Sequence, residues 1–102
     1  MKNTSSNSPP MNGNSETKLP VSNRLGLHAR AAAKIAALAS TFKADILLEK
    51  NGAKADARSI LDILALDAPQ GTEIRVQAAG PDAGQAIAAI SELFFHHFGE
   101  NS

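Results

Sequence analysis

One stretch of ten residues decides how this chain is interpreted: Arg24-Leu25-Gly26-Leu27-His28-Ala29-Arg30-Ala31-Ala32-Ala33. Gly26 permits a sharp backbone turn because it has no Cβ, and an alanine-rich run of high helix propensity follows His28. The sequence therefore predicts that the imidazole of His28 lies at the N-terminus of a helix.

The start of a helix favours an anion. Its first backbone N–H groups have no partners within the helix and carry a partial positive charge. Arg30 adds a guanidinium that can hold phosphoryl oxygens through two parallel hydrogen bonds. His28 and Arg30 are therefore candidates for a nucleophile and its phosphate-binding partner, although these residues alone also fit the more common case of an ordinary surface histidine.

The composition indicates one small domain and excludes several classes of function. A chain of 102 residues, 43% hydrophobic and 20% charged, is long enough for a single two-layer core. Ten basic residues balance ten acidic ones, so no positive field favours nucleic acid or an anionic membrane. The absence of cysteine excludes disulfides and thiolate metal sites. No signal peptide or membrane-spanning run is evident, so we expect a cytoplasmic protein without membrane insertion.

The N-terminal part divides into a tail and the start of a folded domain. Residues 1–16 have little apolar surface to bury, so we expect a disordered tail, followed by a domain over residues 17–102. Alternating residues 17–23 predict a first strand, and Pro20 places it at a sheet edge. Residues 29–41 carry an apolar stripe at helical spacing.

A hairpin and a short helix are predicted next. Residues 44–50 and 53–57 alternate as strands around Asn51-Gly52, which strongly favours a type I′ turn. Ser59 is then placed as the N-cap of a helix over residues 60–66.

The C-terminal part supplies one more strand and one more helix. Residues 72–78 alternate, and residues 83–98 have a helical apolar stripe that Gly99 ends. Asp82 and Gln85 have the spacing of a capping box. The predicted order is βαββαβα, which indicates a two-layer α+β domain.

Three separated motifs resemble the HPr family, the histidine-containing phosphocarriers of the bacterial phosphotransferase system. Gly26-Leu27-His28-Ala29-Arg30 resembles the family's active-site signature, although the family continues with Pro where this chain has Ala31. Residues 54–61 and 80–83 resemble two further landmarks of the family, in register along the chain. The resemblance implies an open-faced β-sandwich, in which three helices cover one face of a four-stranded antiparallel sheet.

The resemblance also implies a function. His28 would accept a phosphoryl group on Nδ1 from phospho-enzyme I and pass it to enzyme IIA-type proteins, while Arg30 stabilises the phosphate. Such a carrier is not an enzyme, needs no metal or cofactor, and is expected to be a monomer. The alternative is an HPr-like regulatory docking module in which phosphorylation is a switch rather than a relay. Both the sugar-uptake branch and the nitrogen-related branch of the system fit the sequence.

Further residues are candidates for regulation and docking. Ser59 is a structural N-cap under any interpretation, and in some relatives the matching serine is phosphorylated by a regulatory HPr kinase. The candidates for a partner-binding surface around His28 are three cations and three leucines: Arg24, Lys34, Arg58, Leu27, Leu61 and Leu64. Each cation equally fits a solvated surface residue. Core packing is the alternative for Leu61 and Leu64, but the resemblance favours their exposure next to His28. Asp62, where many relatives have Gly, puts an acidic group near the docking leucines.

Overall fold

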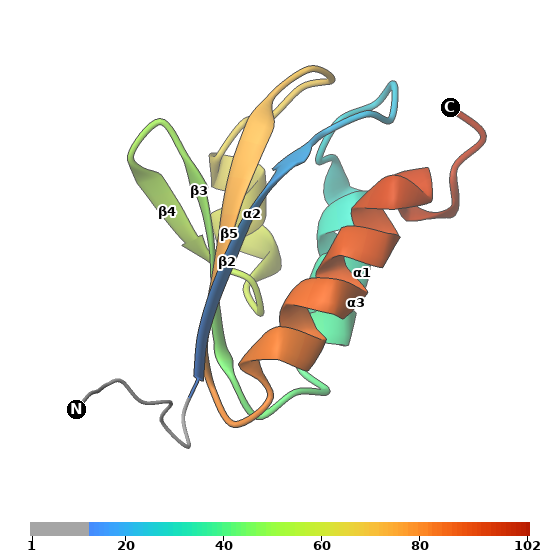
Figure 1. Cartoon of the computed structure of the whole chain (residues 1–102). Coiled ribbons are helices and arrows are strands. Elements are labelled where there is room, and N and C mark those ends of the chain that lie inside the picture. Colours follow the sequence, from blue (N-terminus) through green and yellow to red (C-terminus); the bar gives the residue numbers. More distant parts are fainter. Residues whose placement is uncertain (1–12) are drawn as a thin grey trace.

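Four strands form one antiparallel sheet, and the helices pack together on one of its faces (Figure 1). The computed structural model describes residues 13–102. In chain order the elements are β2 (Gly13–Pro20), α1 (Ala29–Ala39), β3 (Asp45–Lys50), β4 (Ala53–Asp56), α2 (Ile60–Ala65), β5 (Glu73–Gly80), α3 (Ala83–Phe95) and a 3₁₀ turn, η1 (His97–Gly99). The predicted open-faced α+β sandwich and its βαββαβα order are confirmed.

The strand order of the sheet is β2-β5-β3-β4, so β5 and β3 are central. Successive side chains of a strand point to opposite faces, and the face toward the helices carries Leu48, Ile74 and Val76, which are completely buried. Asn51 and Gly52 link β3 to β4 with φ values of 49° and 88°. Two consecutive positive φ values are what a type I′ turn requires, so the predicted hairpin is confirmed.

Strand β2 begins within the segment that the sequence assigned to the tail. Gly13 already pairs with Gly80, whereas the strand was expected to start at residue 17. Backbone hydrogen bonds to β5 hold an edge strand that has one solvated face, so its polar side chains do not prevent pairing. Residues 1–12 of the expected tail lie outside the described residues. The strand ends at Pro20, and its position at the sheet edge agrees with the prediction from that proline.

The last helix is shorter than predicted, because the chain turns after Phe95. His97 and Phe98 have φ values of 53° and 56°, which interrupt the helical path. Phe98 is nevertheless fully buried, and its ring meets that of Phe94 edge-on with 4.9 Å between the ring centres. This aromatic contact fixes the point at which the C-terminal segment leaves α3.

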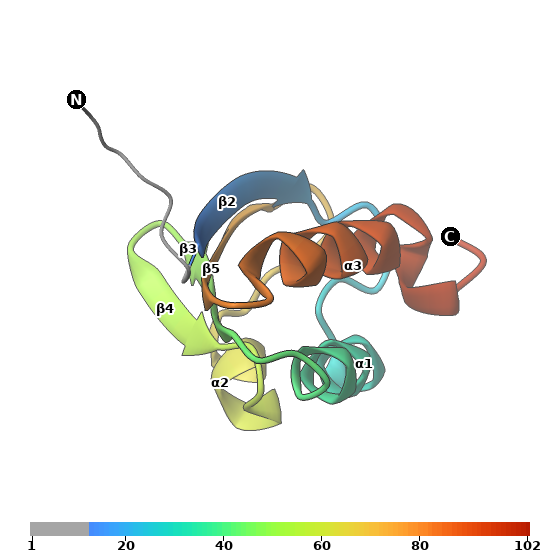
Figure 2. The same ribbon diagram turned by 60° about the horizontal axis from the view of Figure 1, so that its bottom comes forward.

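Helices α1 and α3 lie side by side on one face of the sheet, as Figure 2 shows, and the chain colours of Figure 1 show that they run in roughly opposite directions. At one end, the ammonium of Lys34 on α1 donates to the carbonyl of Phe98 at 2.6 Å. At the other end, the backbone N–H of Lys43 donates to the carboxylate of Asp82 at 2.8 Å. The predicted capping box of Asp82 with Gln85 is therefore wrong, since the aspartate side chain binds the loop after α1 and not its own helix.

Candidate functional site

His28 is the N-cap residue of α1, and its predicted place at the start of a helix is confirmed. Its backbone is extended, with φ −78° and ψ −179°, and its Nδ1 accepts a long hydrogen bond of 3.3 Å from the backbone N–H of Arg30. A side chain that accepts from the first helical turn acts as a cap. Nδ1 therefore faces the end of α1 at which backbone N–H groups lack helical partners.

The turn before α1 depends on Gly26. Its φ is 69°, and a Cβ built on it would lie 2.6 Å from the carbonyl oxygen of Ala68. The N–H of Leu27 donates to that same oxygen at 2.9 Å. Glycine is thus required by its left-handed backbone and by the close approach of the segment after α2, and this contact sets where His28 stands.

The other ring nitrogen of His28 meets a residue that the sequence analysis did not single out. Nε2 is in close contact with one carboxylate oxygen of Glu100, which lies 72 positions further along the chain. The second carboxylate oxygen accepts a hydrogen bond of 3.0 Å from Nδ2 of Asn23, and this amide also donates to the carbonyl of Gly26 at 2.8 Å. No motif marks Glu100. The only clue in the sequence is that it is an acidic residue just after the Gly99 that was expected to end the last helix.

The carboxylate of Glu100 is kept ionised by its surroundings. Burial acts to raise the pKa of Glu100, but hydrogen bonds from Asn23 and His28 lower it and outweigh the burial. The positive charge of Arg30 lowers the pKa further. The side chain of Glu100 is only 11% exposed and that of His28 26% exposed, so this pair is partly shielded from water.

Two arginines border the site on its solvent side. Arg24 and Arg30 are exposed and line an open hollow together with the chain end from Gly99 to Ser102. Guanidinium groups in this position can reach an anion at the start of α1. Lys34 is one helical turn beyond Arg30, and its ammonium is bound to a carbonyl at the end of α3. The structure therefore places Arg24 and Arg30, but not the ammonium of Lys34, around the hollow.

Helix α2 presents apolar side chains beside the histidine. Leu61 is 78% exposed and Leu64 is 37% exposed, and Leu64 shares an open hollow with His28. Leu25 lines the same hollow and is 64% exposed, although the sequence analysis did not include it. The predicted docking role of Leu27 is wrong, because this side chain is 5% exposed and packs in the core. The turn at Gly26 decides which of the two leucines points inward, and leucine type alone carries no such signal.

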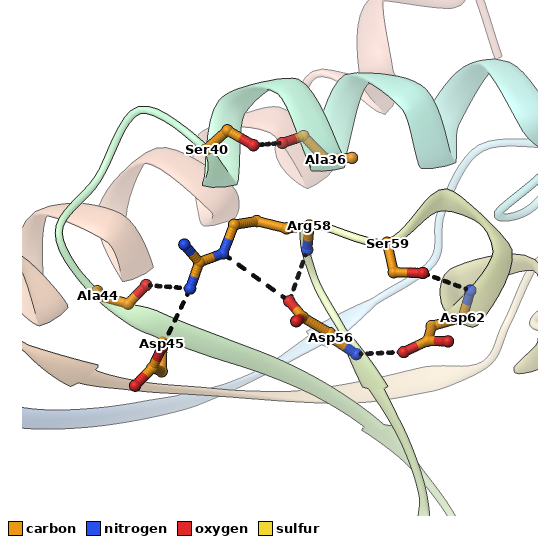
Figure 3. A network of polar contacts seen from close by, with 8 residues as sticks. All are labelled: Ala36, Ser40, Ala44, Asp45, Asp56, Arg58, Ser59 and Asp62. Atoms are coloured by element: carbon orange, nitrogen blue, oxygen red, sulfur yellow. Dashed lines mark hydrogen bonds and ion pairs between the residues drawn. The ribbon is translucent and has the colours of Figure 1, made fainter.

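The side chain of Arg58 points toward Ala44 and Asp45 (Figure 3). Its guanidinium donates to the carbonyl of Ala44 at 3.3 Å and to the carboxylate of Asp45 at 3.0 Å, next to the start of β3. Helix α1 has 11 residues, about 16 Å at 1.5 Å per residue, and His28 stands at its opposite end. The guanidinium of Arg58 is therefore held away from the start of α1, and a role of Arg58 in partner binding stays a prediction.

Ser59 is the N-cap of α2, as predicted. Its Oγ accepts a hydrogen bond of 3.1 Å from the backbone N–H of Asp62, and the carboxylate of Asp62 accepts one of 3.2 Å from the backbone N–H of Asp56 (Figure 3). The carboxylate of Asp62 thus lies at the same helix start as the serine hydroxyl, whereas the carboxylate of Asp56 accepts from the backbone N–H of Arg58 at 2.9 Å. A negative group added to Ser59 would meet the positive end of α2 and, at the same time, the like charge of Asp62.

Residues 13–102 contain neither a candidate metal site nor a candidate membrane-spanning helix. In this part of the chain, no group of three or more His, Cys, Asp or Glu side chains is placed to hold a metal ion. Nor does any helix there combine the length and apolar character that crossing a bilayer requires.

Comparison with known proteins identifies relatives along almost the whole described region. The family model for the PTS HPr component phosphorylation site matches residues 15–95. Phosphocarrier protein HPr of Xylella fastidiosa strain Temecula1 is 44% identical over 87 residues, which cover 85% of this chain and 98% of that protein. Phosphocarrier protein NPr of Escherichia coli K12 is 40% identical over 82 residues, 79% of this chain and 91% of that one.

A solved structure agrees with the sequence relatives. The crystal structure of HPr-C-His from Thermoanaerobacter tengcongensis superposes with a TM-score of 0.83 at 38% sequence identity. The match covers 86% of this chain and 99% of that one. The fold and the sequence therefore point to the same group of proteins.

Proposed function

The chain belongs to the HPr family of phosphocarrier proteins of the phosphotransferase system, and from this we propose that His28 accepts a phosphoryl group from phospho-enzyme I and passes it to enzyme IIA-type proteins. The observation that carries the proposal is the position of His28 at the start of α1, with Nδ1 toward the backbone N–H of Arg30. That nitrogen is the one that can form a bond to phosphorus beside partly positive N–H groups.

The chemistry needs positioning and charge more than a catalytic apparatus. A neutral imidazole is a good nucleophile near neutral pH, and the nitrogen–phosphorus bond is readily broken again. The guanidinium of Arg30, with Arg24 beside it, offsets the charge of the phosphoryl oxygens. In this proposal the protein is a carrier and not an enzyme, acts as a monomer in the cytoplasm, and requires neither metal nor cofactor.

The partner surface is formed by the apolar residues next to His28. Leu25 and Leu64 line one hollow with His28, and the exposed Leu61 is on the same helix as Leu64. Arg24 and Arg30 lie beside Leu25. An exposed apolar patch with a cationic border suits several acidic partners that bind in turn. We assign the docking of both enzyme I and enzyme IIA-type proteins to this surface.

A regulatory docking module is the second candidate. The similarity to a phosphocarrier protein NPr and the exposed apolar face of α2 favour it, since docking requires no discharge of the phosphate. Ser59 could add a second level of control if an HPr kinase modifies it. The added phosphate, with about two negative charges, would then lie at the start of α2 near Asp62 and weaken the binding of acidic partners.

The test is whether the phosphate is accepted and then leaves. Incubation with enzyme I and phosphoenolpyruvate should give an acid-labile phosphoprotein, and addition of an enzyme IIA should discharge it. Arg30→Ala should slow both steps, while Arg75→Ala, on the face of the sheet away from the helices, should slow neither. Stable labelling without discharge would favour the regulatory module, and labelling of a His28→Ala variant would contradict both candidates.

A further inference from the structure

The C-terminal segment folds back so that Glu100 completes the surroundings of His28. Buried Phe98 fixes the point of departure from α3, and a turn follows in which the N–H of Glu100 donates to the carbonyl of His97 at 2.9 Å. The side chain of Glu100 is nearly buried, and its two oxygens meet two different donors, Nε2 of His28 and Nδ2 of Asn23.

Asn23 is placed to hold this carboxylate. It is completely buried, and Nδ2 donates to both Glu100 and the carbonyl of Gly26, on whose turn the position of His28 depends. Its own Oδ1 has no hydrogen-bond partner among the described residues. A buried oxygen without a hydrogen-bond partner lowers stability. In Asn23 this loss is the consequence of an orientation in which Nδ2 can bind both the turn and the carboxylate.

Only an acceptor fits between these two groups. A carboxylate accepts at both oxygens, whereas a carboxamide accepts at one end and donates at the other. One oxygen of Glu100 accepts from the amide of Asn23, and the other faces Nε2 of His28. This second oxygen can only accept, so a hydrogen bond forms there only if Nε2 carries a hydrogen. In a neutral imidazole this leaves Nδ1 unprotonated.

We propose that Glu100 is a positioning residue, which keeps the proton of His28 on Nε2 and leaves the lone pair of Nδ1 free for phosphorylation. The inference rests on the proposed function. The lone pair of Nδ1 forms the bond to phosphorus while the bond from phosphorus to the donor atom breaks, and its electron pair leaves with the donor. Nε2 retains its proton throughout, so the phosphorylated ring is a cation that faces the anionic carboxylate of Glu100.

The return step follows from the same contact. A ring substituted on both nitrogens is a good leaving group, because it departs as a neutral imidazole when phosphorus bonds to an acceptor nucleophile. The carboxylate stabilises the charged ring without forming a bond to phosphorus, and it lies at the nitrogen away from the helix start. Glu100 thus supports both acceptance and discharge.

The test compares three substitutions of Glu100 in the full chain. Glu100→Gln keeps the shape, but its carbonyl should bind Asn23 and its NH₂ should donate to Nε2, which moves the ring proton to Nδ1. We expect phosphorylation by enzyme I and phosphoenolpyruvate to slow about tenfold or more, since a wrong histidine tautomer is costly in hydrolases that depend on one. Glu100→Ala, which merely frees the ring, should slow it less, and Glu100→Asp should retain most of the rate.

The tautomer is read directly in the unphosphorylated protein from the ¹⁵N chemical shifts of the imidazole. In wild type the proton of His28 should be on Nε2, and in Glu100→Gln it should be on Nδ1. The control is Glu92→Gln, which alters an exposed partner of His96 and should change neither the ¹⁵N shifts of His28 nor the rate of phosphorylation. A merely structural role predicts the reverse rate order, with the isosteric Glu100→Gln milder than Glu100→Ala.

The possible results separate the two proposals. If wild type is labelled and Glu100→Gln is labelled equally fast with its proton still on Nε2, the role of Glu100 is wrong and the carrier function stands. If wild type is not labelled at all, the carrier function is wrong and the role of Glu100 falls with it.

Discussion

The described residues hold two histidine–glutamate pairs in contrasting surroundings. His96 and Glu92 are 3.1 Å apart on successive turns of α3, and their side chains are 73% and 70% exposed. His28 and Glu100 are 72 positions apart in the chain, and their side chains are 26% and 11% exposed. The same two functional groups therefore meet once through helical spacing and once through the tertiary fold.

The difference shows that surroundings, and not residue types, decide what such a pair can do. Water and salt screen the exposed pair, and a pair of this kind contributes only a few tenths of a kcal/mol. The shielded pair has a helix start at one ring nitrogen and a carboxylate held by Asn23 at the other. Only the shielded histidine has the two sides of its ring in distinct environments.

The largest effect should come from removing each histidine in turn. His28→Ala should lower phosphorylation by enzyme I at least about a thousandfold, because it deletes the nucleophile. His96→Ala should be labelled like wild type. Acid-labile incorporation of ³²P from phosphoenolpyruvate measures labelling of both variants. Equal loss of labelling in the two variants would contradict the assignment of phosphorylation to His28 alone.

Two phenylalanines near the end of α3 sharpen the comparison through stability. Phe98 is fully buried and anchors the segment that carries Glu100, so Phe98→Ala should lower the free energy of unfolding by roughly 3–5 kcal/mol. Phe95 is 81% exposed, and Phe95→Ala should change it by less than about 0.5 kcal/mol. Urea denaturation followed by circular dichroism gives both values. Similar losses would mean that the C-terminal segment is not anchored by Phe98.

Two glycines with positive φ test the turn on which the shielded pair depends. Gly26→Ala adds backbone strain and forces a Cβ against the carbonyl of Ala68, so we expect a loss of about 2–3 kcal/mol. Gly52→Ala adds strain alone, since nothing lies within 4 Å of its Cβ, and should cost about 1 kcal/mol. Thermal unfolding of the two variants should show this order, and equal losses would mean that a Cβ at Gly26 meets no obstacle.

The smallest effect is a pH dependence that belongs to Glu100. Its pKa is lowered in the folded protein, since the hydrogen bonds from Asn23 and His28 outweigh burial. The stability that the ionised carboxylate contributes is therefore fully present above the ordinary pKa of 4.5 and is lost as the pH falls through the folded value.

Denaturation at several pH values measures this contribution. Wild type should be more stable than Glu100→Gln at pH 7, and the difference should shrink as the pH falls below 4.5. Glu92→Gln, in the exposed pair, serves as the control and should stay close to wild type at pH 7. A difference for Glu100→Gln that is constant down to pH 3 would show that the charge of this carboxylate does not stabilise the fold.

Much of the fold could be predicted because its signals are local. Alternation and helical periodicity located the strands and helices, and Asn51-Gly52 marked the hairpin. Asp82 was misassigned because capping spacing does not reveal that the N–H of Lys43 lies closer to its carboxylate. The start of β2 was missed because an edge strand gains its hydrogen bonds from β5 and needs few apolar residues.

The candidate site divides in the same way. His28 and Arg30 could be placed from a glycine followed by an alanine-rich run, since the turn and the helix start are properties of neighbouring residues. Leu27 was assigned to the docking surface in error and Leu25 was overlooked, because inward and outward directions depend on how α1 meets α2 and the sheet. The direction of the Arg58 guanidinium, toward Ala44 and Asp45, could not be predicted for the same reason.

The sequence by itself determined a histidine at the start of a helix, the order of the elements and their division into two layers. Steric preferences and periodicity act between residues a few positions apart, so they can be recognised in a single chain. Only the tertiary structure decided that Glu100 faces Nε2 of His28 and that Asn23 holds it there. That contact joins residues 72 positions apart, and it exists because buried Phe98 fixes where the C-terminal segment turns back toward the start of α1.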